Sequence, residues 1–155
     1  MQQNYWLMKT EPDEFSIDAL AAKKVEPWTG VRNYQARNFM RSMRKGDGVL
    51  FYHSSCEVPG VAGIAEVATA AYPDPTQFDP KSDYFDAGSK RDDPRWSLVD
   101  VKFKRKLKRV VTLAELKGRK ELKDMVLLRP GNRLSVSPVT QVQWDFILGL
   151  EHASA

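Results

Sequence analysis

The chain has 155 residues, the length of one ordinary domain, and can bury roughly 70% of the surface that it would expose when unfolded. A hydrophobic content of 42% and a charged content of 28% are typical of soluble globular proteins and exclude a disordered chain. The formal net charge of +4 permits an anionic partner without requiring one. We therefore expect a single domain that spans residues 1–155.

The cysteine content limits which disulfide and metal sites are possible, and the apolar runs limit the cellular location of the protein. Cys56 is the only cysteine, so an internal disulfide is impossible, and one cysteine with two histidines cannot form the usual zinc site. No apolar run approaches the roughly 20 residues that span a bilayer, and the N-terminus lacks the layout of a signal peptide. We expect a cytoplasmic protein with no metal, no cofactor and no membrane contact.

The N-terminal part is predicted to contain a strand followed by two helices. Tyr5–Met8 is short and aromatic, as many strands are, and Ser16 is a suitable N-cap for a helix that ends near Lys23. A second helix is predicted to begin near Asn33 and to end at Gly46. Its apolar stripe consists of Ala36, Phe39, Met40 and Met43.

The middle of the chain is predicted to contain strands separated by one long loop. Val49–His53 and Val61–Ala71 are predicted strands, and Trp96–Phe103 alternates apolar and polar residues as a half-buried strand does. Residues 72–94 are rich in Pro, Asp and Ser, and a loop of this length is usually functional or held by its own side chains. Its aromatic residues are expected to tie it down: Phe78, Tyr84 and Phe85.

The C-terminal part is predicted to contain two capped helices, a short helical segment and a strand. The capping boxes are Thr112 with Glu115 and Thr140 with Gln143. The helical segment covers Glu121–Val126, and the strand covers Arg133–Ser137. Because strands and helices are interspersed without regular βαβ spacing, we predict an α+β fold around a mixed, strongly curved sheet.

The stretch from Trp28 to Asn38 combines residue types that neither a helix nor a core requires. Aromatic faces can stack on a base, and amides or guanidinium groups can recognise its edge. The stretch supplies both: Trp28 and Tyr34 as faces, Asn33, Gln35 and Asn38 as amides, and Arg32 and Arg37 as charges. The alternative is that the aromatics are core, Asn33 only caps the helix, and the arginines form a solvated face.

Two further segments carry polar residues that could serve a site. Tyr52, His53, Ser54 and Ser55 lie at a strand end, where site residues often occur. Thiol catalysis by Cys56 with His53 is disfavoured, because residues i and i+3 of a strand point to opposite sides. Lys9 and Glu11 leave the strand that carries Trp6, and nothing in the spacing of Glu11, Asp13 and Glu14 selects a catalytic pair of carboxylates.

Residues 101–109 contain six basic residues and no acidic residue. On a strand, Lys102, Lys104 and Lys106 would line one face and could bind phosphates, as could Arg41 on the polar side of its helix. The alternative, that the lysines protect a strand edge from aggregation, remains open.

Together these segments resemble the EVE domain family of the PUA-like superfamily, which includes thymocyte nuclear protein and its bacterial relatives. The matching runs are Y-W-L-M-K-T-E-P at 5–12, W-T-G-V-R-N-Y-Q-A-R-N-F at 28–39, F-Y-H-S-S-C at 51–56 and P-G-V-A-G-I-A-E-V at 59–67. Further matches are A-Y-P-D-P-T-Q-F-D-P at 71–80, P-R-W-S-L-V-D-V-K-F at 94–103, L-A-E-L-K at 113–117 and R-L-S-V-S-P-V at 133–139. The resemblance covers essentially the whole chain.

The resemblance implies a PUA-like open β-barrel flanked by short helices and a pocket for a modified base, with 5-methylcytosine in DNA as the favoured ligand. The pocket residues that it implies are Trp28, Arg32, Asn33, Tyr34, Gln35, Arg37 and Asn38, with Tyr52, His53, Ser54 and Ser55 opposite and Trp6, Lys9 and Glu11 at the rim. The sequence departs from the family at Ser55, where relatives often have asparagine, so no amide contact is carried over to this position.

We therefore expect a monomeric nucleic-acid-binding module that recognises a modified base in DNA or RNA and is not an enzyme. Two alternatives remain. The first is an enzyme that acts on a modified nucleotide or nucleoside and uses His53 or Glu11 for proton transfer. The second is an adaptor that binds another protein and has no affinity for bases.

Overall fold

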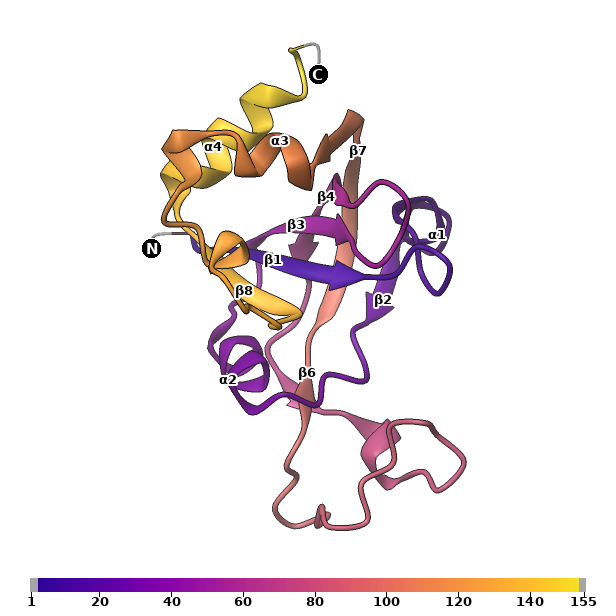
Figure 1. Ribbon diagram of the computed structural model, residues 1–155. Helices are drawn as coiled ribbons and strands as arrows, with labels where there is room; N and C mark the ends of the chain where they lie inside the picture. Colours follow the sequence, from indigo (N-terminus) through magenta and orange to yellow (C-terminus); the bar gives the residue numbers. More distant parts are fainter. Residues whose placement is uncertain (1–2, 154–155) are drawn as a thin grey trace.

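The computed structural model describes residues 3–153, in which short helices surround a curved six-stranded sheet (Figure 1) and two further short strands pair with each other. The elements of the N-terminal half are β1 (Tyr5–Thr10), α1 (Ile17–Lys23), β2 (Val25–Pro27), α2 (Tyr34–Ser42), β3 (Gly48–His53) and β4 (Gly60–Val67). They are followed by β5 (Tyr72–Pro73), the 3-10 turn η1 (Pro75–Phe78), β6 (Ser97–Leu98), β7 (Asp100–Thr112) and α3 (Leu113–Lys117). The last elements are the 3-10 turns η2 (Lys120–Leu122) and η3 (Val126–Leu128), β8 (Val136–Val139) and α4 (Gln141–Leu150). The predicted α+β class is confirmed.

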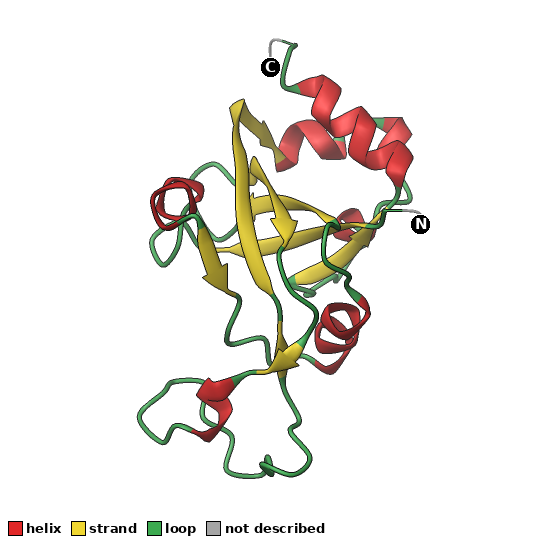
Figure 2. Ribbon diagram, turned by 180° about the vertical axis from the view of Figure 1, so that it is seen from behind, coloured by secondary structure: helices red, strands yellow, loops and turns green. Residues whose placement is uncertain are grey.

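Six strands form a mixed sheet in the order β2-β7-β4-β3-β1-β8. Only β1 and β3 run parallel, and the other neighbours are antiparallel. Register shifts in the β3–β4 and β4–β7 pairs add local curvature, and the sheet curls into the half-barrel that the PUA-like resemblance predicts (Figures 1 and 2). Thr10 pairs with His53, so β1 and β3 end side by side and the loops that follow them leave the sheet together.

Alternation along the strands divides the apolar core between the two faces of the sheet. Phe51 belongs to a cluster with Trp28 and Met40 on the inner face, which α1 and α2 close. Its neighbour Tyr52 belongs to a second cluster, with Ile147, on the face that α3 and α4 cover. Consecutive residues of β3 therefore serve different halves of the molecule.

Three of the predicted helix starts are confirmed by their caps. The Ser16 hydroxyl accepts a hydrogen bond from the backbone N–H three residues on, at 3.1 Å, and the Asn33 side chain does the same at 3.0 Å. Thr140 and Gln143 form the reciprocal capping box at the start of α4. With 10 residues, α4 is the longest of the described helices, and no helix within residues 3–153 could cross a membrane.

The fourth predicted cap is only half correct. Thr112 does cap α3 by accepting from the Glu115 N–H at 3.1 Å. The Glu115 carboxylate, however, accepts from two guanidinium nitrogens of Arg109, at 2.8 and 2.9 Å, instead of from the Thr112 N–H. A charge-assisted bidentate pair is stronger than a neutral capping bond, which explains the choice.

Several predicted boundaries differ from the structure. Helix α2 ends at Ser42 and not at Gly46, because Met43 is extended (φ −68°, ψ 148°) and the Asp47 carboxylate accepts from the Arg44 N–H at 3.0 Å. The strand predicted to reach Ala71 ends at Val67. The helical segment predicted at 121–126 is replaced by the two turns η2 and η3, and the strand predicted from 133 begins at Val136.

The long loop of residues 74–95 extends away from the sheet (Figures 1 and 2), and a buried polar side chain holds it together. Gln77 is fully buried, and its amide donates to the Asp74 and Trp96 carbonyls at 2.7 and 2.8 Å while it accepts from the Trp96 N–H at 3.0 Å. Tyr84 and Phe85, expected to tie the loop down, stay 39% and 42% exposed. The loop is ordered, as predicted, but by hydrogen bonds more than by aromatic packing.

Candidate functional site

A cavity of about 550 Å³ opens between the two edges of the curled sheet. Its lining comes from the end of β1 and the turn after it, from β2 and the loop that follows, from the loop after β3, from the long loop and from the segment before β8. The lining residues are Lys9, Thr10, Glu11, Glu14, Phe15, Glu26, Pro27, Trp28, Thr29, Gly30, Val31, Arg32, Asn33, Ser54, Ser55, Tyr84, Arg133 and Ser135. Its volume is within the range of small-ligand sites, roughly 300 to 1,000 Å³.

Trp28 belongs both to the core and to the cavity wall. Its side chain is 8% exposed, and its ring meets Phe51 edge-on with the centroids 5.7 Å apart. Its backbone N–H donates to the Val99 carbonyl at 3.0 Å, which fixes the start of the loop. The indole N–H has no partner within residues 3–153 and is not sealed from solvent. It is therefore a fixed donor that a molecule in the cavity could use.

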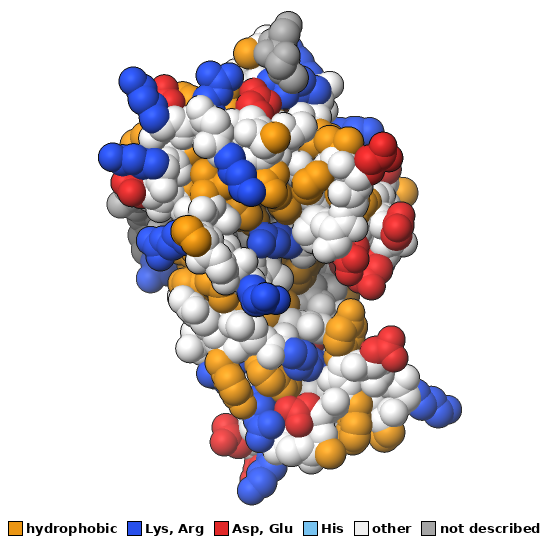
Figure 3. Space-filling model, in the orientation of Figure 1, with side chains coloured by type: hydrophobic (Ala, Val, Ile, Leu, Met, Phe, Trp, Pro, Cys, Tyr) orange, Lys and Arg blue, Asp and Glu red, His pale blue; other side chains and the backbone are white. Residues whose placement is uncertain are grey.

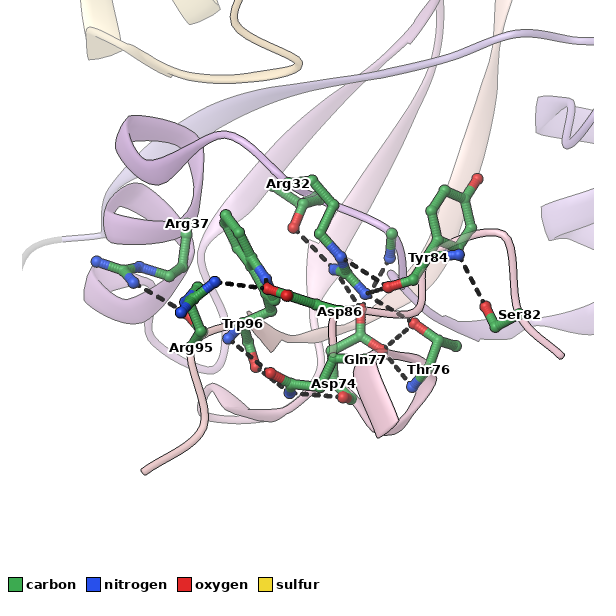
Figure 4. A network of polar contacts seen from close by, with 12 residues as sticks. Arg32, Arg37, Asp74, Thr76, Gln77, Ser82, Tyr84, Asp86, Arg95 and Trp96 are labelled. Atoms are coloured by element: carbon green, nitrogen blue, oxygen red, sulfur yellow. Dashed lines mark hydrogen bonds and ion pairs between the residues drawn. The ribbon is translucent and has the colours of Figure 1, made fainter. Parts of the chain in front are cut away.

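Arg32 lines the cavity but has no free donor. Its five N–H groups make five hydrogen bonds: Nε and Nη2 to the Tyr84 carbonyl at 3.1 and 2.7 Å, Nη1 to the Val31 carbonyl at 2.9 Å and to Asp74 at 3.1 Å, and Nη2 to the Thr76 hydroxyl at 3.0 Å (Figure 4). The guanidinium thus joins the loop after β2 to the long loop. We interpret Arg32 as a brace of the wall and not as a group that contacts a ligand.

Tyr84 is brought to the cavity by contacts at Gly30. Gly30 has a φ of +86° and donates its N–H to the Asp74 carboxylate at 2.8 Å. A Cβ atom at this position would lie 2.6 Å from the Tyr84 ring, so only glycine allows the ring to lie against the loop. The Tyr84 ring and the Trp28 ring therefore belong to walls that different parts of the chain supply.

The cavity contains charges of both signs. The Lys9 ammonium has no ion pair within the described residues, burial lowers its pKa, and it lies 5.9 Å from the centre of the Tyr52 ring. Glu11 and Glu14 contribute carboxylates, and Glu26 is already paired with Lys23. Arg133 also lines the cavity without a partner among the described residues, so the arrangement offers two unpaired cations and two carboxylates to a ligand that has both donors and acceptors.

The loop after β3 contributes two serines to the rim. The Ser54 N–H donates to the Thr10 carbonyl at 2.9 Å, so this loop is fixed to the end of β1. Ser55 has a φ of 53°, in the left-handed region that residues other than glycine and asparagine rarely adopt. Both serines line the cavity.

Three predicted pocket residues of the sheet lie outside the cavity. Trp6 is buried against Phe39, and its indole N–H donates to Asp47 at 2.9 Å. Tyr52 belongs to the core of the opposite face, where burial raises the pKa of its hydroxyl to about 12. His53 accepts from the Ile17 N–H through Nε2 at 3.1 Å, and burial lowers its pKa. These side chains support the elements around the cavity without lining it.

Most predicted pocket residues of helix α2 also point elsewhere. Tyr34 stacks on Trp96 with the centroids 4.9 Å apart, and Arg37 donates to the Arg95 carbonyl at 2.9 Å and to the Asn38 side chain at 2.8 Å. Burial, and then the charge of Arg41, lower the Arg37 pKa. Gln35 lines a smaller neighbouring hollow, and within α2 and its cap only Asn33 reaches the main cavity.

The four cations predicted to bind phosphate are all engaged with protein groups. Lys102 and Lys104 lie 3.5 and 4.0 Å from the Glu66 carboxylate, and Lys106 lies 3.0 Å from Asp18. Arg41 donates to the Ser97 hydroxyl at 3.0 Å and to two carbonyls of the long loop. None of the four lines the cavity.

Of the predicted pocket residues, the cavity brings together Trp28, Arg32, Asn33, Ser54, Ser55, Lys9 and Glu11. Sequence reasoning missed two kinds of lining residue. Some, such as Thr29 and Gly30, lie within the stretch from Trp28 to Asn38. Others, Tyr84 and Arg133 above all, carry no local signal because only the tertiary fold brings them to the cavity. Within residues 3–153 no cluster of His, Cys, Asp or Glu could hold a metal ion.

The sequence matches the EVE domain over residues 4–150. The chain belongs to the EVE domain family. It is 46% identical to human thymocyte nuclear protein 1 over 167 aligned positions, which cover 96% of this chain and 74% of that protein. An uncharacterised protein of Schizosaccharomyces pombe is 38% identical, and the alignment covers 94% of this chain and 67% of that protein.

Solved structures show how closely this EVE domain follows its relatives. A crystal structure of a Pseudomonas putida protein is 54% identical, with a TM-score of 0.93, and covers 95% of this chain and 99% of that one. The human THYN1 protein, solved in complex with DNA that contains 5-methylcytosine, is 45% identical, with a TM-score of 0.95, and covers 99% of this chain and all of that one. An ASCH protein of Zymomonas mobilis, 11% identical with a TM-score of 0.56, shares the fold.

Proposed function

We propose that this EVE domain binds nucleic acid and accommodates one modified cytosine, such as 5-methylcytosine, in the cavity beside Trp28. The observation that carries the proposal is an open cavity with a fixed indole wall, in a fold that matches the human THYN1 protein with its methylcytosine-containing DNA. An aromatic face contributes about 1 to 3 kcal/mol per stacked base. We propose DNA as the natural polymer because the THYN1 complex contains DNA.

The charged groups of the cavity match the edge of cytosine. A carboxylate of Glu11 or Glu14 accepts from the exocyclic amino group, in the way that acidic side chains recognise cytosine. The Lys9 ammonium, which has three N–H donors, donates to the ring carbonyl and the ring nitrogen. Thymine presents a carbonyl where cytosine presents its amino group, so this arrangement disfavours thymine although thymine also carries the methyl group.

A base in a duplex reaches the cavity only after it leaves its stack. Extrusion costs a few kcal/mol, which stacking and the edge hydrogen bonds must offset. Burial of the methyl group alone contributes about 0.8 kcal/mol, a preference of roughly fourfold over cytosine. Stronger selectivity for the methylated base requires a cavity wall that fits the methyl group closely, so that an unmodified base leaves an unfavourable gap. Arg32 and Tyr84 hold this wall.

The site supports a binding module better than an enzyme. His53, considered for proton transfer, does not line the cavity, and its Nε2 already accepts from a backbone N–H. Glu11 lines the cavity, but the described residues place no partner against its carboxylate that would set up a catalytic pair. The protein is therefore proposed to bind its ligand without turning it over.

The test is equilibrium titration of the purified protein with duplexes that differ only in one central cytosine, either methylated or not, at several salt concentrations. We expect tighter binding of the methylated duplex, by about fourfold or more, at every salt concentration. Equal affinity for both duplexes would exclude recognition of the modification. Incubation followed by chromatography of the nucleosides tests the enzyme alternative, for which a new product would be required.

A further inference from the structure

The segment before β8 carries two arginines that no other residue in the described part of the chain engages. Arg129 and Arg133 are both exposed, and their guanidinium groups have no hydrogen-bond or ion-pair partner within residues 3–153. The cations Lys102, Lys104, Lys106 and Arg41 differ in this respect, because each of the three lysines is paired with a carboxylate and Arg41 is bonded to the long loop. A cation that is already paired gains less from a phosphate than a free one does.

The backbone that carries the two arginines is ordered by local hydrogen bonds. The Asn132 N–H donates to the Arg129 carbonyl at 3.1 Å, and the Asn132 side chain accepts from the Leu134 N–H at 3.1 Å. The Ser135 carbonyl then accepts from the Lys9 N–H at 2.8 Å, which joins the segment to β1. The arginines are thus held at a defined place beside the cavity.

A second hollow adjoins the cavity at this segment. It has a volume of about 330 Å³ and is lined by Asn33, Gln35, Arg129 and Arg133, among others. Asn33 and Arg133 also line the main cavity, so the two hollows meet at these residues. The hollow contains no carboxylate, whereas the main cavity contains three. A neutral or anionic occupant is therefore favoured, and the two guanidinium groups select an anion.

The hollow lies beside the start of β8, on a face of the molecule that carries many basic side chains. Lys and Arg side chains lie down the middle of the face in front of β1 and β8, whereas Asp and Glu side chains gather toward the edge near α1 (Figure 3). Strand β7, with the paired lysines, lies behind β1 and β8 and is in front when the molecule is turned (Figures 1 and 2).

We infer that Arg129 and Arg133 bind a backbone phosphate next to the nucleotide whose base occupies the cavity. The inference rests on the proposed function and adds to it the path of the nucleic-acid backbone. The base enters the main cavity, and the sugar-phosphate chain passes through the adjoining hollow. Each guanidinium can offer two parallel N–H donors to phosphate oxygens, a geometry that a lysine ammonium cannot provide. The exposed amide of Gln35 lies on the same path.

Matched double variants test this inference. Arg129→Ala with Arg133→Ala and, as control, Lys102→Ala with Lys104→Ala both lower the formal net charge from +4 to +2. For the arginine variant we expect affinity to fall about tenfold for methylated and unmethylated duplexes alike, and the salt dependence of log K to lose about 1 to 2 in slope. For the control we expect little change. An equal loss in both variants would overturn the inference, because it would reflect net charge alone.

A second measurement separates the inference from the proposed function. Wild-type protein should bind the 3′,5′-bisphosphate of 5-methyl-2′-deoxycytidine more tightly than the free nucleoside, by about tenfold, and the arginine variant should bind both alike. Retention of the full gain by the variant would overturn the inference and leave base recognition intact. If methylated and unmethylated ligands bind equally but the arginines still control the phosphate gain, the proposed function fails and the inference stands. No binding of any probe would overturn both.

Discussion

The carboxylate of Asp74 lies 3.1 Å from Nη1 of Arg32, and neither group has any hydrogen-bonding capacity left. The carboxylate is fully buried and accepts from the Gly30 N–H, from Arg32 and from both the N–H and the hydroxyl of Thr76. The guanidinium donates all five of its N–H groups. One pair therefore connects the cavity wall, the turn η1 and the Tyr84 backbone, and the shape of the cavity depends on it.

The first prediction follows from this pair. Removal of one partner of a buried ion pair leaves the other charge uncompensated, which typically costs about 3 to 5 kcal/mol. We expect Arg32→Ala to lower the free energy of unfolding by about 3 kcal/mol in urea titrations, and Arg32→Lys by less, because lysine keeps the charge and three donors.

Arg129→Ala is the matched control, since it removes an exposed arginine that has no partner among the described residues, and it should change stability by less than about 0.5 kcal/mol. Similar stabilities for Arg32→Ala and Arg129→Ala would mean that the five hydrogen bonds of Arg32 contribute nothing net, and the role of Arg32 as a brace would be wrong.

The second prediction concerns the contact between Gly30 and Tyr84. Gly30 and Gly131 both have a positive φ, +86° and +75°, so replacement by alanine strains the backbone by about 1 kcal/mol at either position. A Cβ at Gly131 meets nothing within 4 Å, but at Gly30 it would lie 2.6 Å from the Tyr84 ring. We expect Gly30→Ala to destabilise more than Gly131→Ala and to weaken binding of a methylated duplex, because the ring must leave the wall.

The double variant Gly30→Ala with Tyr84→Ala isolates the contact. Without the ring, the extra cost at Gly30 should disappear and the unfolding penalties of the two glycine positions should become equal. If Gly30→Ala stays more destabilising in the absence of the ring, the clash with Tyr84 is not its cause.

Local signals in the sequence were sufficient for the parts of the fold that depend on neighbours along the chain. Ser16, Asn33 and Thr140 were identified as helix starts because an N-cap acts on a backbone N–H only two or three residues away. Helix ends were predicted less well. Gly46 resembles a C-terminal cap, but the helix ends at Ser42, because the Asp47 carboxylate accepts from the Arg44 N–H and the chain turns there. An interaction of this kind leaves no periodic pattern in the sequence.

The candidate site shows the same limit more clearly. The resemblance pointed to the runs at 6–12, 28–38 and 52–55, and the cavity takes residues from all three. It could not tell that Trp6 and Tyr52 face away from the cavity, since that depends on how the sheet curls. Tyr84 and Arg133 reach the cavity from segments 50 or more residues away from Trp28, so their part in the lining depends entirely on tertiary structure.

The third prediction concerns His53, whose Nε2 accepts from the N–H of Ile17 at the first residue of α1. Burial lowers the His53 pKa below the ordinary value of 6.5, with Asp18 opposing the shift and Lys106 adding to it. The folded state disfavours the protonated ring. The neutral His53 ring therefore contributes fully to the stability of the fold above pH 6.5, and this contribution is lost as the pH falls from 6.5 through the folded-state pKa.

Urea unfolding at pH values from 8 to 5 measures this loss directly. His53→Gln keeps an oxygen acceptor for the Ile17 N–H but cannot be protonated in this range, so its stability should depend less on pH than that of the wild type. Parallel pH profiles for the two proteins would show that the pKa of His53 does not differ between the folded and unfolded states.

The last prediction uses the double role of Trp28, which is 8% exposed and lines the cavity while it packs edge-on against Phe51. Loss of this side chain should cost both stability and binding, so Trp28→Ala cannot separate the two. Trp28→Phe keeps an aromatic face against Phe51 but removes the indole N–H, which has no partner in residues 3–153. We expect this variant to lose about 1 to 2 kcal/mol of unfolding free energy through the smaller ring.

In binding, Trp28→Phe should keep only part of the stacking contribution, because the phenyl ring is smaller than the indole, so affinity for a methylated duplex should fall by about fivefold to tenfold. Phe51→Leu is the matched control, because it disturbs the same core contact from the side that does not line the cavity. It should lower stability by a similar amount and leave affinity nearly unchanged. If Phe51→Leu weakens binding as much as Trp28→Phe does, Trp28 supports the fold of the cavity wall without contacting the base.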